Sequence, residues 1–192
     1  MLEEEYQTRR VLPRHLRRRE TPEAPFSYEI RRARPADLPA VREIYNHYVA
    51  NSTVTFDEDA MSLREWKQKY SWLHRLGMPF LVAESPTGQL LGYALVSPWK
   101  QKRAYRYTVE TSIYLGPAAS GKGLGRALMG ALIDAAKEAG MKEMIAVIAD
   151  QGADASIALH EKFGFRETGR MGRVGFKFDR WLGTVLLQKT LK

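Results

Sequence analysis

The sequence predicts one α/β domain built on a mixed β-sheet with helices on both faces. Residues 108–114 are rich in strand formers and lead through a glycine-dense loop into an amphipathic helix over residues 124–136. Residues 144–149 (MIAVIA) then form a continuously apolar run, as expected of a strand that is buried on both faces. Strand, helix and strand in this order form a right-handed βαβ unit with parallel strands. Short turns connect the other neighbouring strands, which predicts antiparallel pairs around that unit.

The first expected elements lie before residue 57. Residues 28–31 (YEIR) alternate in polarity and predict a strand. Asp37 is expected to be the N-cap of a helix that has Pro39 in its first turn and an apolar face running to Tyr48. Residues 51–56 form an irregular connection to the next element.

A second helix and a hairpin follow. Ser62 and Glu65 have the spacing of a capping box and open the helix, which Gly77 ends. Residues 80–83 and 90–97 are expected to be strands, and the turn sequence SPTG joins them.

The last elements follow the central βαβ unit, whose helix Gly140 ends. Residues 154–163 predict a short helix, and residues 166–171 and 182–191 predict two more strands. The expected order of elements is therefore βααβββαβαββ.

The glycine loop before the central helix indicates a phosphate-binding site. Gly121, Gly123 and Gly125 let the backbone approach an anion, and the first turn of the helix offers unpaired N–H groups. Residues 116–122 (GPAASGK) nearly match the ATP-binding P-loop, but glycine follows where that motif needs a Ser or Thr for Mg²⁺. The glycines also miss the dinucleotide fingerprint G-x-G-x-x-G. The alternative is a tight turn with no ligand.

Composition limits the class of protein. The 192 residues are 44% hydrophobic and 27% charged, and they include no cysteine, which excludes disulfides, thiolate zinc sites and cysteine nucleophiles. We expect no signal peptide and no membrane span, and a cytoplasmic protein. A net charge of +8 fits nucleic-acid binding, reception of small anions or simply a basic surface. Because no aromatic–basic array is present, nucleic acid is the weaker interpretation.

The basic residues cluster only near the start of the chain. Residues 1–27 hold four arginines between positions 14 and 19 and three prolines, and they predict an extension that precedes the domain. The domain itself is expected to span residues 28–192.

The element order and the glycine loop resemble the GNAT superfamily of acyl-CoA-dependent N-acetyltransferases. The pyrophosphate-binding motif of that superfamily is [Q/R]-x-x-G-x-[G/A], and residues 120–125 (SGKGLG) match it except at Ser120. The resemblance is closer to the phosphinothricin N-acetyltransferase group and covers nearly everything from Tyr28 onward. The blocks that carry it are residues 46–48, 52–56, 98–105, 108–110, 159–165 and 175–181.

The resemblance implies acetyl-CoA as co-substrate, with no metal. Backbone groups of the strand before the loop would hold the pantetheine arm and polarise the thioester carbonyl. Ala153 is a second departure, since the group has an Asn there that binds the pantetheine. The cofactor-binding residues implied are Ile113, Tyr114, Leu115, Ser120, Gly121, Lys122, Gly123, Leu124, Gly125, Arg126 and Ser156.

Two residues are the candidate catalytic groups. Acetyl transfer by direct attack needs a neutral amine, so a general base is useful. The counterpart of Glu110 is the proposed base in this group, acting directly or through water, and the alternative is a strand glutamate in a salt bridge. His160 stands where many superfamily members have a tyrosine that protonates the thiolate. It could instead share the base role or be structural.

The same resemblance implies a substrate site. Lys100 and Lys102 would receive a substrate carboxylate as point charges, while Phe56, Trp99 and Tyr105 would line the pocket. The alternatives are a solvated loop for the lysines and core positions for the aromatic residues.

Three functions follow as hypotheses. The first is acetylation of the α-amino group of a small amino acid or analogue, of the phosphinothricin, methionine sulfoximine or methionine sulfone class. The second is acetylation of a protein amine by the same fold, and the third is a basic nucleic-acid-binding module. The two lysines favour the first over the second. Resemblance to this group also implies a homodimer.

Overall fold

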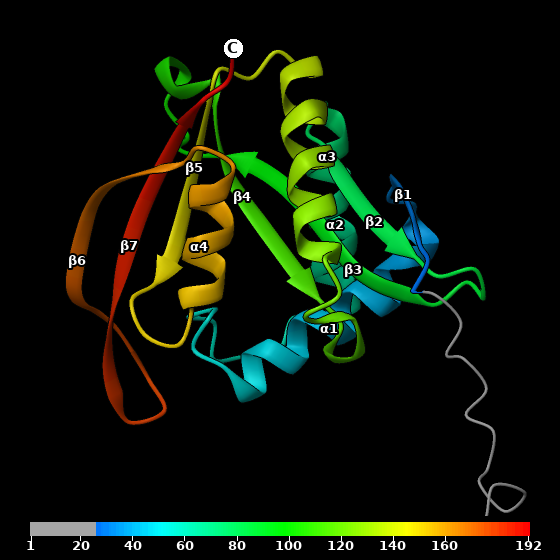
Figure 1. Ribbon diagram of the computed structural model, residues 1–192, viewed down its shortest axis with the longest axis horizontal. Helices are drawn as coiled ribbons and strands as arrows, with labels where there is room; N and C mark the ends of the chain where they lie inside the picture. The colour runs from blue at the N-terminus through cyan, green and yellow to red at the C-terminus, as the bar shows by residue number, and fades with distance from the viewer. Residues whose placement is uncertain (1–25) are drawn as a thin grey trace, which may run out of the picture.

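The computed structural model describes residues 26–192, which form a seven-stranded mixed sheet with four α-helices (Figure 1). The strand order is β1-β2-β3-β4-β5-β7-β6. The strands are β1 (Glu29–Arg32), β2 (Phe80–Glu84), β3 (Leu90–Pro98), β4 (Thr108–Leu115), β5 (Glu143–Ala149), β6 (Arg166–Lys177) and β7 (Arg180–Thr190). The helices are α1 (Leu38–Asn51), α2 (Leu63–Arg75), α3 (Leu124–Glu138) and α4 (Asp154–Lys162).

The predicted βαβ unit is confirmed as β4, α3 and β5. β4 and β5 pair in parallel, and the other five strand pairs in the sheet are antiparallel. The apolar run that predicted β5 is mostly buried, because α3 and α4 cover one face of the sheet. The fold is therefore the mixed α/β arrangement that the element order predicts.

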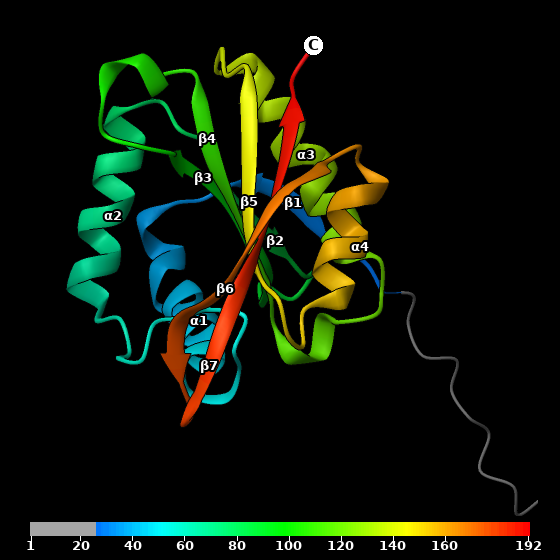
Figure 2. The same cartoon turned by 90° about the vertical axis from the view of Figure 1, so that its left-hand side faces the viewer.

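The helices divide between the two faces of the sheet. Figure 2 shows the sheet nearly edge-on, with α1 and α2 on one side and α3 and α4 on the other. Alternate residues of β2 belong to two separate hydrophobic cores. Leu81 and Ala83 pack on the α3 side of the sheet, and Phe80 and Val82 pack on the side of α1 and α2. The sheet thus separates two buried clusters, and a site between its strands can open to both sides.

The start of α2 is the capping box expected from the sequence. Glu65 N–H donates to Ser62 Oγ over 3.2 Å, and Ser62 N–H donates to Glu65 Oε2 over 2.7 Å. This reciprocal pair satisfies N–H groups that helix geometry leaves without partners.

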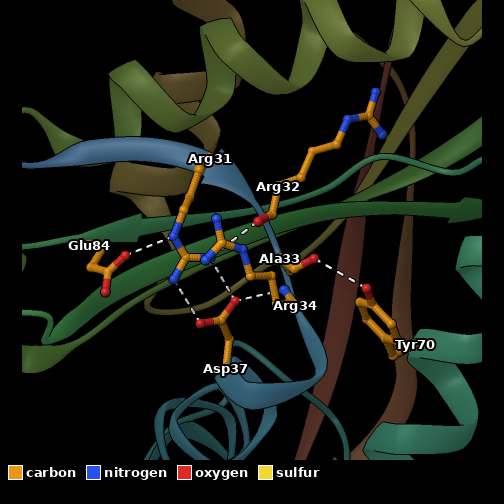
Figure 3. Close-up of polar contacts among 7 residues, drawn as sticks. All are labelled: Arg31, Arg32, Ala33, Arg34, Asp37, Tyr70 and Glu84. Atoms are coloured by element: carbon orange, nitrogen blue, oxygen red, sulfur yellow. Dashed lines mark hydrogen bonds and ion pairs between the residues drawn. The ribbon is translucent and has the colours of Figure 1, made fainter.

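Asp37 takes the expected N-cap position of α1, but its carboxylate does not cap that helix. It accepts two hydrogen bonds of 2.8 Å from the Arg31 guanidinium, which also donates to Glu84 over 2.7 Å (Figure 3). Arg31 therefore holds the pKa of Asp37 below its usual value. Tyr70 donates to the Ala33 carbonyl beside this cluster. The edge strand β1 is thereby tied to β2, to the start of α1 and to α2.

The hairpin of β6 and β7 is longer than the sequence predicts. The predicted strand over residues 166–171 continues to Lys177, through Gly172 and Gly175, although glycine is uncommon inside strands. The register shifts between Met171 and Gly175, and Arg173 has a φ of 54°. Pairing resumes at Gly175, so the extra residues form a bulge within the strand and the hairpin continues to Lys177.

The predicted extension at residues 1–27 lies mostly outside the described residues. Phe26 and Ser27 are described, and the Phe26 ring centroid lies 5.6 Å from that of Tyr28. Phe26 also packs against the core cluster on the α3 side. Within residues 26–192, no helix is both long and apolar enough to cross a bilayer.

Candidate active site

The sheet opens between β4 and β5. These strands pair only at residues 108–110 with 143–145, and Figure 1 shows them diverging beyond that point. β4 remains paired to β3 along its other edge as far as Leu115. Residues 111–115 therefore have one backbone edge inside the sheet with no strand partner, and on it the Leu115 carbonyl accepts a hydrogen bond from the Tyr48 hydroxyl over 2.7 Å. Backbone N–H and C=O groups need hydrogen-bond partners, so this edge suits a ligand that carries amide groups.

A cavity of about 330 Å³ occupies the opening. Its walls come from β4, β5, the first turn of α3 and α4. Seven of the site residues expected from the sequence line it: Glu110, Ile113, Tyr114, Leu115, Gly125, Ser156 and His160. Ala153, buried at the N-cap of α4, also lines the cavity and brings no polar side-chain atom to it.

The glycine loop adjoins this opening at the start of α3. Gly121 and Gly123 have φ of +75° and +80°, a left-handed conformation that glycine adopts without strain. Within the described residues, the N–H groups of residues 120–125 make no hydrogen bond to another backbone group. Leu124 is completely buried, so only its backbone can reach a ligand. Successive free N–H groups at a helix N-terminus make an anion site, and they fit a pyrophosphate.

Two cations stand beside the loop. Lys122 and Arg126 are both exposed, and the Lys122 ammonium lies 4.9 Å from the ring centroid of Phe26. Ser120 is also exposed. These side chains are therefore free to meet an anionic ligand at the mouth of the opening.

Glu110 is half-buried at the cavity wall, and its carboxylate makes no hydrogen bond or ion pair within residues 26–192. Burial raises the pKa of its carboxyl, and the nearby ammonium groups of Lys69 and then Lys100 oppose that rise. A carboxylate with a raised pKa and no fixed partner is suited to accepting a proton. The salt-bridge alternative for Glu110 receives no support from these contacts.

His160 is buried and held on two sides. Its Nδ1 lies 2.8 Å from the Ser156 carbonyl oxygen, and its Nε2 lies 3.3 Å from Thr111 Oγ1. Because a carbonyl only accepts, Nδ1 carries the proton in the neutral ring, and Nε2 accepts from the Thr111 hydroxyl. Burial lowers the pKa of His160, which favours the neutral ring. This geometry suits a proton acceptor or a positioning group better than a proton donor.

Glu110 and His160 approach the opening from opposite faces of the sheet. Glu110 and Thr111 are successive residues of β4, so their side chains point in opposite directions. Glu110 lies on the side of Lys69 in α2, and Thr111 meets His160 in α4. The cavity therefore has a carboxylate on one side and an imidazole on the other.

The expected substrate residues do not line this cavity. Trp99, Lys100, Lys102 and Tyr105 line a separate surface hollow beside the end of α2. Among these, Lys100 acts on Glu110, and its ammonium also lies 4.5 Å from the Trp99 ring centroid. Phe56 lines neither hollow, and its ring packs against the backbone of Gly175 in β6. The structure thus relates one of the two expected lysines to Glu110.

Lys69 is a site residue that sequence reasoning missed. It belongs to the polar-looking stretch KQKY of α2, where a lysine is normally solvated. The available signal was its spacing of three residues after Trp66 and four before Leu73, which places it on the buried face of the helix.

Comparisons with known proteins find one matching family model and several similar sequences. The acetyltransferase (GNAT) family model matches residues 41–165. The phosphinothricin N-acetyltransferase of Alcaligenes faecalis is 39% identical over 180 residues, covering 89% of this chain and 91% of that protein. The L-methionine sulfoximine/L-methionine sulfone acetyltransferase of Pseudomonas aeruginosa is 41% identical over 166 residues, covering 86% and 96%.

One solved structure is similar to this chain in both fold and sequence. The GNAT superfamily phosphinothricin acetyltransferase of Sinorhizobium meliloti, in complex with acetyl-CoA, superposes with a TM-score of 0.82 at 41% identity. The match covers 86% of this chain and 89% of that one.

Proposed function

The chain belongs to the acetyltransferase (GNAT) family and is an acetyl-CoA-dependent N-acetyltransferase, and we propose that its acceptor is a small amino acid or analogue. Acetylation would take place on the α-amino group. One observation carries the proposal: Glu110 has no partner of its own at the cavity wall, and two ammonium groups act on it. The names of the relatives, which specify phosphinothricin and methionine sulfoximine or sulfone, support the same class of acceptor.

The opening between β4 and β5 fits the co-substrate. The unpaired edge at residues 113–115 would bind the amides of the pantetheine arm, and the N–H groups of residues 120–125 would bind the pyrophosphate. Lys122 and Arg126 would add positive charge beside those N–H groups. Acetyl-CoA supplies the activated acetyl thioester when bound.

Glu110 is proposed as the general base. It would take a proton from the acceptor's ammonium group, directly or through water, which leaves a neutral amine to attack the thioester carbonyl. The carbon–sulfur bond then breaks, the acylated nitrogen releases its second proton to solvent to give the amide, and the thiolate takes a proton from solvent. Glu110 returns its own proton to solvent before the next turnover. We assign no proton donation to His160, because its lowered pKa leaves the ring neutral; we expect it to position Thr111 and the cavity wall.

The proposed catalytic unit is residues 28–192, since every residue given a role lies in that range. The homodimer implied by the resemblance and a cytoplasmic location are proposed with it. The family assignment favours an enzyme over a nucleic-acid-binding module.

A substrate panel combined with one variant tests the proposal. Thiol release from acetyl-CoA is measured with free amino acids, their analogues, their amides and a peptide amine. We expect free acids of the phosphinothricin and methionine sulfoximine class to be the preferred acceptors. Activity confined to the peptide would refute this and favour a protein acceptor.

The variant Glu110→Gln keeps the shape of the side chain and removes the proton acceptor. We expect kcat to fall by about 10²–10⁴-fold, with acetyl-CoA binding retained and part of the loss recovered in alkaline buffer. Glu143→Gln on the adjoining strand β5 makes the same charge change away from the opening and serves as the control. Full activity of Glu110→Gln at every pH would place the base elsewhere.

A further inference from the structure

Lys69 has an unusual place for a lysine in α2. Trp66 and Leu73, which flank it at helical spacing, are 1% and 0% exposed, while the neighbouring Lys67 is exposed. The Lys69 ammonium lies 5.2 Å from the centroid of the Trp66 indole, and the side chain is half-buried. The stem of Lys69 is therefore held against the helix–sheet interface, and its charge does not extend freely into solvent.

Apart from the Trp66 ring, the ammonium group of Lys69 has no partner within residues 26–192. Within residues 26–192 it makes no hydrogen bond and no ion pair. Burial lowers its pKa, and the carboxylates of Asp57 and Glu110 act against that effect. Asp57 already accepts a hydrogen bond from the Tyr45 hydroxyl. Trp66, over whose ring the Lys69 ammonium lies, packs edge-on against Tyr45, and Tyr45 packs in the same way against Tyr114 of the cavity wall, with ring centroids 5.6 and 5.2 Å apart. Glu110 and Tyr114 are four residues apart on β4, so their side chains share this face of the sheet. Lys69 therefore lies on the Glu110 side of the cavity and makes no ion pair with that carboxylate.

This arrangement matches the charges of an α-amino acid. A zwitterion places an ammonium and a carboxylate on one carbon, so it can offer an opposite charge to each of two groups that do not neutralise one another. Lys100 and Lys102 differ from Lys69, because both are exposed. Lys100 also acts on Glu110, but its ammonium lies 4.5 Å from the Trp99 ring centroid at the surface.

We propose that Lys69 determines specificity by binding the carboxylate of the acyl acceptor, whose amine lies at Glu110. This inference rests on the proposed function, since it concerns the same acceptor. It adds a cation from α2 to a carboxylate site that the resemblance implies only for the segment between β3 and β4.

The test compares an amino acid that the wild type acetylates with its primary amide, which keeps the amine and lacks the negative charge. A hydrogen bond to a charged group contributes about 1.5–3 kcal/mol, so Lys69→Met should raise KM for the acid by about 10–100-fold. The KM for the amide should change by less than about threefold, because no charged bond is lost. Lys67→Met, two residues away on the exposed face, is the matched control and should behave as wild type.

Two further measurements separate specificity from other roles. Lys69→Arg keeps the positive charge and should retain the preference for the acid. If it does, the effect of Lys69→Met is due to the lost charge and not to a folding defect. If Lys69 acted only by tuning Glu110, Lys69→Met would move the acidic limb of the pH profile and lower kcat for acid and amide alike. Equal losses of that kind, or no loss for the acid, would overturn the inference.

The wild type distinguishes this failure from that of the proposed function. A wild-type enzyme that acetylates no free amino acid refutes the proposed function, and this inference with it. A wild type that prefers the acid over the amide, together with a Lys69→Met variant that keeps the preference, refutes this inference alone.

Discussion

Gly123→Ala tests whether the glycine loop binds acetyl-CoA. Gly123 is the N-cap of α3 with φ of +80°, and a Cβ built there would meet no atom within 4 Å. An added methyl therefore costs only the strain of a left-handed residue, about 1–2 kcal/mol. For a chain of this length that lowers Tm by about 2–8 °C. Since the methyl would point into open space at the loop, any effect on binding must arise from contact with the ligand.

The control is Gly140→Ala at the other end of the same helix. Gly140 has φ of +81° and the same absence of neighbours within 4 Å, so the cost in stability should match. Thermal unfolding is followed for the wild type and both variants, with and without acetyl-CoA.

Acetyl-CoA at about 100 times its wild-type Kd should stabilise the wild type and Gly140→Ala by about 2.7 kcal/mol. If the methyl weakens binding about tenfold, the same concentration stabilises Gly123→Ala by about 1.4 kcal/mol, roughly half the increase in Tm. Equal increases in both variants would refute the phosphate-site interpretation and leave the loop as a turn.

Three further outcomes are expected. In acidic buffers kcat/KM should fall as Glu110, whose pKa is raised by burial, becomes protonated; a flat profile into strong acid would contradict its role as the base. Arg31→Met should destabilise the fold by about 1–3 kcal/mol at neutral pH. The stability difference between wild type and Arg31→Met should shrink as pH falls through the lowered pKa of Asp37, because the protonated carboxyl no longer favours the folded state. Chemical denaturation at a series of pH values measures this difference, and a difference independent of pH would contradict the role of the pair. The β6–β7 hairpin exposes large apolar side chains, including Phe176, which is 51% exposed, and such a surface suits a contact between two copies of the chain. Light scattering should therefore find a homodimer, and Phe176→Ser should weaken it. A monomeric wild type would refute the expected dimer.

Local patterns in the sequence were sufficient for most of the elements. The capping box at Ser62 and Glu65, the glycines around α3 and the apolar run of β5 each depend on neighbours within a few residues. Helix and strand periods are local properties, and for that reason the element order and the parallel β4–β5 pair followed from the sequence. The same locality explains why the predicted strand ends at residue 171, since the bulge that carries β6 on to Lys177 depends on its pairing with β7.

The tertiary structure alone decided how distant residues share the site. Asp37 is diverted from capping α1 because folding brings Arg31 of β1 to its carboxylate, a contact that no helix signal encodes. The divergence of β4 from β5 beyond Glu110 depends on how two strands separated by a whole helix pack. Lys69 looks like a solvated helix position in the sequence, and it joins Glu110 only because α2 lies across that face of the sheet. The sequence was sufficient to identify the residue types for acetyl transfer. The distances between them and the electrostatic surroundings of each depend on long-range packing, which local periodicity does not determine.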